Sequence, residues 1–510
     1  MIAQALWRTR LSEHHSAAPF NLHKEQQNLK WIVFFFGIAM AIRSPAVPLL
    51  FFREESQGGF GISPAMMKLL HIVMFFLPRI LSPVMGKCVD YWPLWGSHRA
   101  SYMTVASEGI MLSTLFLALV VYYGGSLAWV VFGYVMLEML IAFLFVVQTS
   151  AVVDHSRQTA DRSYNHSIQL WLWIWETCGI AIGAVSTGLA MHFLQNTIDF
   201  DESFSDQIRI IPVPHTLPIR EVTGVLFFVS TLIILTVIYI CASYNAPPRY
   251  VSSGNSSPLL PWRQWRCPTR EQLHYYIPPL SRRLLFVIGL DSLTPDIDTL
   301  RMTYAIQLLH VHMAFPAITV AVESIALIIG ISLVHLWHHY GWQFRVNWIL
   351  CRMIRILVFG VMSMYFYNPN VFSWPAEITL AISIFIDTLA AQSGEASQET
   401  VLLKFTPHRD TATGASVLKS ISQILRGMNT VITASVLYIA NIQPDRYDNV
   451  GHYTLGATLV MLVTFILGMF LFTQDIELYV REVQAHQSDS ESDNEEEQSE
   501  SIRDDEEISC

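Results

Sequence analysis

Long apolar runs separated by short polar segments dominate the chain. Read with a window of about 19 residues, the pattern predicts one set of membrane-spanning helices at 31–52, 64–86, 101–123, 126–153, 166–193 and 222–244. A second set is predicted at 284–311, 315–337, 346–367, 374–403, 411–442 and 453–472. Each run is long enough to cross a hydrocarbon layer of roughly 30 Å. We therefore expect an all-α polytopic membrane protein with twelve transmembrane helices.

The predicted spans divide into two sets of six with a polar linker between them. This division predicts a cytoplasmic N-terminal segment (1–30), a six-helix bundle (31–244) and a cytoplasmic linker loop (245–283). A second six-helix bundle (284–474) and a cytoplasmic tail (475–510) follow. Two six-helix, pseudo-symmetric halves are the layout of transporters whose halves rock about a site at the membrane midplane. The expected fold is thus major facilitator-like.

Composition excludes several classes of protein. Hydrophobic residues make up 52% of the chain and charged residues only 14%, against about 25% charged residues in soluble domains. The tail holds 14 acidic and 2 basic residues of a chain whose net charge is −10, so the acidity belongs to the tail and a nucleic-acid partner is not expected. We expect the tail to be disordered, because so polar a segment buries too little apolar surface to fold.

Motifs for catalysis, metals and cofactors are not legible. The six cysteines lie far apart and lack metal-ligand spacing, and the chain has neither a phosphate-binding glycine loop nor a zinc-protease motif. We therefore expect neither an enzyme nor a bound metal or cofactor.

Lysine and arginine are unevenly distributed between the predicted loops. Loops on the side of the N-terminus hold most of them, whereas the opposite loops hold only Arg53, Arg209, Arg220 and Arg446. Basic flanks remain cytoplasmic in membrane proteins. Both termini and the linker are therefore expected in the cytoplasm, in an integral multi-pass protein of the plasma membrane that contacts the lipid bilayer.

The most specific motif lies between the second and third predicted spans. It reads Gly86-Lys-Cys-Val-Asp90-Tyr-Trp-Pro-Leu-Trp-Gly-Ser-His-Arg99-Ala-Ser-Tyr102. Asp90 sits at a helix end, and Arg99 can pair with it across a short turn. Such a pair can latch neighbouring helices in one access state and release them in the other. The alternative is an ordinary basic loop with an incidental aspartate.

This loop resembles the motif G-x-x-x-D-x-x-P-L-x-G-x-R-R-x-x-Y of the folate-biopterin transporter family of the major facilitator superfamily. Val152-Val153-Asp154-His-Ser-Arg157 is similar to the family's V-V-E-x-x-R, and Thr294-Pro295-Asp296-Ile-Asp298 to its P-S-x-D segment. Segments 406–410 and 420–423 add weaker matches in the second half. The resemblance implies a carrier for folate, biopterin or a related pteridine, with Asp154 and Arg157 joining Asp90 and Arg99 in a cytoplasmic gate.

The chain also departs from the family pattern. His98-Arg99 replaces two arginines, Thr149 stands where the family usually has an aspartate, and Leu300-Arg301-Met302-Thr303 replaces an aromatic run and leaves Tyr304 alone. A relative with a changed substrate is therefore an alternative to a pteridine carrier.

The seventh predicted span is rich in ionisable groups. At 100° per residue, Asp291, Asp298 and Arg301 fall on one stripe of an α-helix, whereas Asp296 faces away unless Pro295 breaks the helix. Ionisable groups at membrane depth are expensive unless they are paired or hydrated. The stripe therefore predicts the wall of a cavity. The alternative is an internal salt bridge from Asp298 to Arg301 that holds the bundle together.

Other spans carry candidate polar groups. Asp387 in the tenth span shares a stripe of small and polar residues with Gln398, which indicates either a cavity lining or close helix packing. Arg43 and Arg79 can each hold a substrate carboxylate through paired hydrogen bonds, or they can be buried partners of Glu108, Glu138 and Glu176. Lys419 and Arg426 add basic groups to the eleventh span.

We interpret the chain as a secondary transporter that moves a small organic anion by alternating access. The predicted substrate-binding residues are Arg43, Asp291, Asp298, Arg301, Tyr304 and Asp387. A carboxylate that takes up a proton would couple transport to protons, and the sequence does not identify which one. A different class of function also fits, namely a non-transporting receptor or scaffold that recruits partners through the acidic tail.

Overall fold

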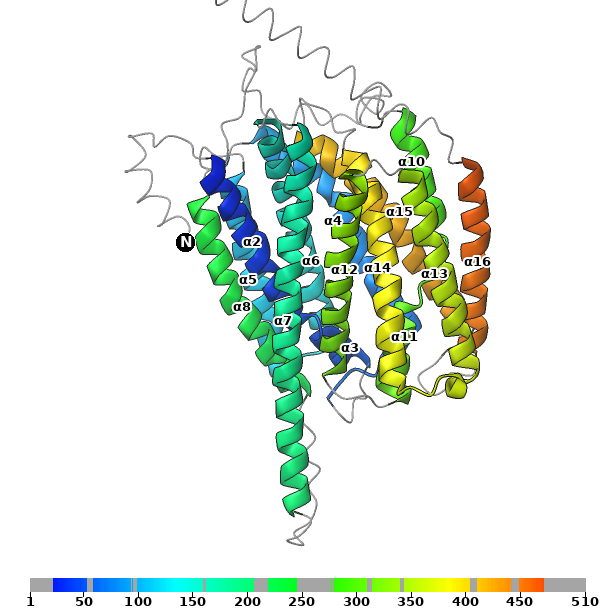
Figure 1. Ribbon diagram of the computed structural model, residues 1–510. Coiled ribbons are helices and arrows are strands. Elements are labelled where there is room, and N and C mark those ends of the chain that lie inside the picture. Colours follow the sequence, from blue (N-terminus) through cyan, green and yellow to red (C-terminus); the bar gives the residue numbers. More distant parts are fainter. Residues whose placement is uncertain are drawn as a thin grey trace, which may run out of the picture.

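The structure is a computed structural model of the chain and describes residues 22–52, 58–92, 94, 99–158, 162–205, 219–244, 277, 279–309, 314–339, 344–403, 411–440, 442 and 449–471. The described chain is almost entirely helical (Figure 1). Its first set of helices is α2 (Leu22–Arg43), α3 (Ala46–Phe52), α4 (Pro64–Tyr91), α5 (Ala100–Tyr122), α6 (Leu127–Gln158), α7 (Arg162–Ser205) and α8 (Ile219–Ser243).

The second set begins with a discontinuous segment. It comprises α10 (Pro279–Asp291), α11 (Asp298–Thr303) and the π-helical turn η3 (Tyr304–Leu308). The remaining elements are α12 (Phe315–His339), α13 (Phe344–Tyr367), the short 3-10 turn η4 (Pro369–Val371), α14 (Ala376–Leu403), α15 (Thr411–Ile439) and α16 (Val450–Leu471).

Each predicted span coincides with one of these helices or with a broken helix. Within the described residues, 10 segments are long and apolar enough to cross a membrane, the first of them running from Lys24 to Phe52 through α2 and α3. The two further spans expected from the sequence are α15, whose 29 residues include Lys419 and Arg426, and the discontinuous α10–α11 segment. The prediction of an all-α polytopic membrane protein is confirmed.

Two boundaries differ from the prediction. The first helix begins at Leu22 rather than at residue 31, because a helix continues through polar residues that a hydropathy window rejects. The seventh span is not one helix, since α10 ends at Asp291 and α11 starts at Asp298, with Pro295 in the gap. The predicted tail and most of the predicted linker lie outside the described residues.

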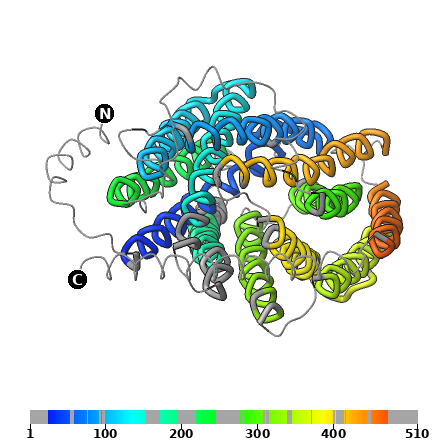
Figure 2. Tube along the Cα trace, turned by 90° about the horizontal axis from the view of Figure 1, so that it is seen from above, coloured from blue at the N-terminus to red at the C-terminus, as the bar shows by residue number. Residues whose placement is uncertain are grey.

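The helices are arranged in two groups that meet along two seams (Figure 2). In the first group α2 packs on α7 and α8, and α5 packs on α6 and α8; in the second, α12 packs on α14, and α13 on α14 and α16. Across the groups, α4 packs on α15 and α7 packs on α12. The second span thus meets the eleventh and the fifth meets the eighth, which is the pairing that a two-fold relation between two sets of six produces.

The two ends of the molecule are called the upper side and the lower side, as they are drawn in Figure 1. The upper side is the one at which α2 begins, and α4 ends there close to the start of α15. The lower side is the opposite one, beyond which α7 projects well past the other helices (Figure 1).

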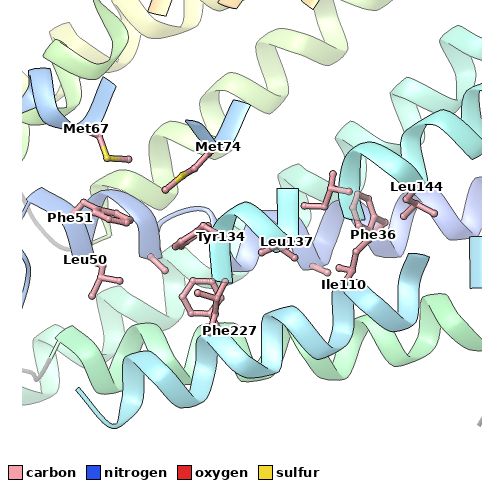
Figure 3. Packing of buried hydrophobic residues seen from close by; sticks show 14 of the residues in the cluster. Phe36, Leu50, Phe51, Met67, Met74, Ile110, Tyr134, Leu137, Leu144 and Phe227 are labelled. Atoms are coloured by element: carbon pink, nitrogen blue, oxygen red, sulfur yellow. The ribbon is translucent and has the colours of Figure 1, made fainter. Parts of the chain in front are cut away.

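Apolar side chains fill the first group and also cover much of the outside. The main buried cluster includes Phe36, Leu50, Met74, Ile110, Leu137 and Phe227 of the first group (Figure 3), and it extends into the second group. On the outside, large apolar side chains such as Leu112, Phe132 and Leu357 remain exposed. An exterior of this kind suits lipid, in which an apolar surface carries no penalty.

Glycines bring α2 and α7 into close backbone contact. A Cβ atom added to Gly179 would lie 2.1 Å from the carbonyl oxygen of Phe34, and one added to Gly37 would lie 2.3 Å from that of Glu176. In membranes, where helices are not driven together by hydrophobicity, small residues at an interface allow such close packing. The crossing of α2 and α7 therefore depends on these glycines.

We expect Gly179→Ala to destabilise the protein by about 1–3 kcal/mol, because the added methyl group overpacks a backbone contact. The measurement is the thermal unfolding of the purified protein in detergent. Gly360→Ala on α13 is the matched control, since no atom lies within 4 Å of its added Cβ. Equal melting temperatures for the two variants would contradict close packing at Gly179.

Candidate functional site

A buried charge network lies in the second group of helices. The Nη2 atom of Arg301 on α11 lies 2.6 Å from Oδ2 of Asp387 on α14, and 3.5 Å from Oδ1 of Asp298. Arg355 on α13 donates from Nε to the other oxygen of Asp387 over 2.9 Å. Asp387 thus holds two guanidinium groups contributed by two different helices.

Arg301 retains unused hydrogen-bonding capacity. Its residue exposure is 1%, and its Nε and Nη1 atoms have no hydrogen-bond partner among the described residues. An unsatisfied buried donor typically costs about 1–3 kcal/mol. The guanidinium is therefore held in place by Asp387 and keeps two buried donors without a partner among the described residues.

The break in the seventh span places Asp298 next to open space. Residues 292–297 separate α10 from α11, and the side chain of Asp298 at the start of α11 is 60% exposed. Its neighbour Ile297 and the following Leu300 are both fully buried. Non-helical backbone at membrane depth is tolerated where it lines a cavity or is buried in protein. The Asp298 carboxylate therefore faces an accessible space beside Arg301.

Asp291 belongs to a different group, and the single stripe expected for the seventh span is wrong. Its Oδ1 atom lies 2.8 Å from Nη2 of Arg352. Its Oδ2 atom accepts from Trp348 Nε1 over 2.9 Å and from Gln398 Nε2 over 3.0 Å. The stripe assumed one continuous helix, whereas the break after Asp291 turns this carboxylate toward α13 and α14 and away from Arg301.

Tyr304 and Arg43 lie apart from these two groups. Tyr304 opens the π-helical turn η3, is buried, and makes an edge-to-face contact with Phe366 at a centroid distance of 5.1 Å. Arg43 ends α2, donates to the sulfur of Met40, and lies within electrostatic range of Glu138 and Tyr134 on α6. Within the described structure, Arg43 makes no ion pair with the residues around Arg301. The structure thus brings together Asp298, Arg301 and Asp387 of the six predicted binding residues.

Asp90 connects the two groups of helices on the upper side. It forms an ion pair with Arg99 at 3.4 Å, and its Oδ2 atom accepts from both the backbone N–H and the hydroxyl of Thr413, each over 2.8 Å. Tyr102 fixes the turn by donating to the carbonyl of Trp92 over 2.8 Å. We call Asp90, Arg99 and Thr413 the upper latch. The side chains of Asp154 and Arg157 lie outside the described part of the structure.

A second connection lies on the lower side and was not predicted. Lys68 near the start of α4 forms an ion pair with Asp296 at 2.5 Å, with side chains only 7% and 18% exposed. The backbone around Asp296 is fixed as well, because its N–H donates to Thr433 and its carbonyl accepts from Tyr453, each over 2.7 Å. We call Lys68 and Asp296 the lower latch. A lysine inside an apolar run was the available sequence signal.

Helix α4 is thus attached to the second group of helices near both of its ends. Lys68 and Asp90 are separated by roughly 33 Å along a helix that rises 1.5 Å per residue, which is about the thickness of the hydrocarbon layer. Moving the halves apart on the upper side would break the Asp90–Thr413 contact, and moving them apart on the lower side would break the Lys68–Asp296 ion pair. This geometry suits a protein whose halves rock about a central site.

Comparison with known proteins agrees with the sequence resemblance. Residues 49–203 match the model of the BT1 family, the folate-biopterin transporter family. This match includes the Asp90–Arg99 loop and the Asp154–Arg157 segment. The resemblance to this family is therefore confirmed over that part of the chain. A search of curated proteins found no match.

Solved structures of major facilitator transporters share the fold. A nucleoside transporter, NupG, has a TM-score of 0.58 at 10% identity, covering 89% of this chain and 100% of the other. A D-xylose-proton symporter gives 0.59 at 8% identity, covering 88% and 96%. The human organic anion transporter MFSD10 gives 0.56 at 12% identity, covering 87% and 100%. The chain is an integral multi-pass membrane protein, and its fold is that of the major facilitator transporters.

Proposed function

We propose that this protein is a secondary active transporter that moves a small organic anion, namely folate, biopterin or a related pteridine, across a membrane by alternating access. The family match supports the substrate class. The observation that carries the proposal is the buried guanidinium of Arg301, which has two unused donors and lies at a helix break in the second half. Discontinuous helices commonly form the substrate sites of secondary transporters.

In this proposal the break in the seventh span forms the wall of the substrate site. Asp387 and Arg355 hold Arg301 in position, and Arg301 donates to an acceptor on the substrate. Asp298 lies beside it in accessible space and can accept a hydrogen bond from an amino group of a pteridine or take up a coupling proton. The network thus serves a substrate that carries both donors and acceptors.

The two latches supply the access mechanism. With both closed, as in this structure, α4 is connected to the second half on both sides of the membrane. Release of the upper latch opens the site to one side, and release of the lower latch opens it to the other. The distribution of basic residues supports a cytoplasmic upper side, in a protein of the plasma membrane.

The test is uptake of labelled folate, biopterin and a panel of related metabolites into proteoliposomes, with and without a pH gradient. We expect at least one pteridine to accumulate in a saturable manner, and a gradient-dependent rate indicates proton coupling. Deleting residues 475–510 addresses the receptor or scaffold alternative: uptake that survives the deletion supports a transporter. No flux of any compound, combined with tail-dependent partner binding, would support the scaffold instead.

We expect Asp90→Asn to reduce the maximal rate of uptake about tenfold with little change in the apparent affinity. The substitution removes the charge that pairs with Arg99 and weakens the acceptor for Thr413, so it alters the upper latch and not the substrate site. Initial-rate kinetics in proteoliposomes separate the two parameters. Thr413→Val, which removes one of the hydrogen bonds, should show a smaller effect of the same kind. A pure loss of affinity in Asp90→Asn would argue against a latch.

A further inference from the structure

A small, partly open cavity lies between the two halves and is lined by α4, α6 and α15. Its polar lining includes Arg79 and Ser82 from α4, Thr149 from α6, and Lys419, Ser420 and Gln423 from α15. Neither the resemblance nor the Arg301 network assigns a role to it. Because it has walls from both halves, its shape changes whenever the halves move.

The cavity lies directly below the upper latch. The upper latch and the cavity involve the same two helices, α4 and α15, since Asp90 on α4 accepts a hydrogen bond from Thr413 on α15. Ser420 and Lys419 are about two helical turns below Thr413, and Arg79 is about three turns below Asp90, at 3.6 residues per turn. A solute that enters when the upper latch opens meets this cavity before it reaches the middle of the membrane.

The charge of the lining is one-sided. Among the described lining residues, Arg79 and Lys419 are cationic and none is acidic. Lys419 lies 5.8 Å above the ring of Phe145 and forms no ion pair within the described residues. Glu176 on α7 acts on Lys419 electrostatically from beyond ion-pair distance.

Ser420 provides an independent indication of a ligand. The residue is only 3% exposed, and its hydroxyl has no hydrogen-bond partner among the described residues. Buried hydroxyl groups nearly always find a partner. Because Ser420 lines the cavity beside Lys419, an acceptor placed there would satisfy the hydroxyl and neutralise the ammonium group together.

The size of the cavity restricts what can enter it. Its volume is about 20 Å³, which is room for about one or two water molecules. A fused ring system does not fit in this conformation, whereas a compact charged group at the end of a solute requires little additional space.

We propose that this cavity is an anion-binding site that takes the carboxylate or phosphate group of a water-soluble anion arriving from the upper side. Lys419 supplies the positive charge, and Ser420 donates a hydrogen bond. The inference deepens the proposed function, because it assigns the anionic group of the solute to a place separate from the Arg301 network. Binding itself does not depend on whether the protein completes a transport cycle.

The experiment measures binding to the purified full chain in detergent, by calorimetry and by thermal shift, with glutarate and inorganic phosphate as probes and chloride as the reference salt. We expect Lys419→Gln to weaken binding about ten- to a hundredfold, because it removes a charge-assisted hydrogen bond. Ser420→Ala should weaken binding several-fold. Lys30→Gln and Ser422→Ala are the matched controls, since Ser422 is equally buried and unpartnered but does not line the cavity.

Unchanged affinity for both probes in Lys419→Gln would overturn the proposal, as would equal effects of Ser420→Ala and Ser422→Ala. A parallel titration with phosphatidylglycerol distinguishes the source of the anionic group. Stabilisation by this lipid without any by glutarate or phosphate would also overturn the proposal. If Lys419→Gln does not purify, Lys419→Arg must retain binding within a few-fold. If no pteridine is taken up but the protein still binds anions in a manner that depends on Lys419, the proposed function is rejected and the anion site is retained.

Discussion

Replacing Arg301 by alanine should reduce uptake by at least a hundredfold while the protein still reaches the membrane in normal amount. The buried guanidinium offers Nε and Nη1 to an acceptor, and a hydrogen bond to a charged group contributes about 1.5–3 kcal/mol. Losing two such bonds corresponds to a factor of a hundred or more, since 1.4 kcal/mol is tenfold. Initial rates in proteoliposomes, normalised to the reconstituted protein, provide the measurement.

The fold should survive this substitution because of Arg355. Removing one member of a buried ion pair normally leaves an uncompensated charge, but Asp387 keeps its bond to Arg355 at 2.9 Å. Arg426→Ala is the control, since Arg426 pairs with the 42% exposed Glu395, donates to Gln398 and is not bonded to the Arg301 network. Arg301→Lys, which retains the charge without the planar fork, should recover only part of the rate. Unchanged kinetics in Arg301→Ala would remove this residue from the substrate site.

The positions of the helices could be predicted from the sequence because the membrane imposes a simple requirement. Every backbone polar group must be satisfied inside the hydrocarbon layer, so long apolar runs become helices. The predicted spans at 101–123 and 346–367 differ from α5 and α13 by at most two residues at either end. Breaks in helices are harder to place. Pro295 indicated a break in the seventh span, but the extent of the break, from residue 292 to 297, depends on contacts of Asp296 with Thr433 and Tyr453.

The candidate site could be predicted only in part. Charged residues inside apolar runs stand out, and Arg301, Asp298 and Asp387 do lie together in the structure. Their pairing could not be derived, because a helical projection relates residues within one helix and not between helices. Arg355 and Arg352 therefore completed networks that the seventh span alone did not indicate.

The paired charges bear on whether the interior is a binding site or a structural core. Asp387 and Asp298 together balance the charges of Arg301 and Arg355, as the carboxylates of a purely structural network would. Two features distinguish this network from such a core, namely the unused donors of Arg301 and the 60% exposure of the Asp298 side chain. A network built only for stability would satisfy its donors internally. We infer that the network positions Arg301 for an external partner.

Breaking the lower latch should shift the protein toward a conformation that is open on the lower side. Lys68→Ala removes one partner of an ion pair whose side chains are only 7% and 18% exposed, which costs the closed state about 3–5 kcal/mol. This loss changes the ratio of closed to open molecules more than a hundredfold, because each 1.4 kcal/mol is a factor of ten. Asp296→Asn should have the same direction of effect.

Distances between spin labels at Tyr123 and Ile439 report this shift in a cysteine-free background. Both positions are about 80% exposed and lie at the lower ends of α5 and α15, one in each half. We expect each single variant to show an additional component at longer distance between the labels. This component should decrease in the double variant Lys68→Asp with Asp296→Lys, because the exchange restores the attraction with reversed charges. Arg426→Ala serves again as the control, because its pair with Glu395 lies within the second half. Single variants with the distance distribution of the unmodified protein would show that Lys68 and Asp296 contribute to packing and do not hold the halves together.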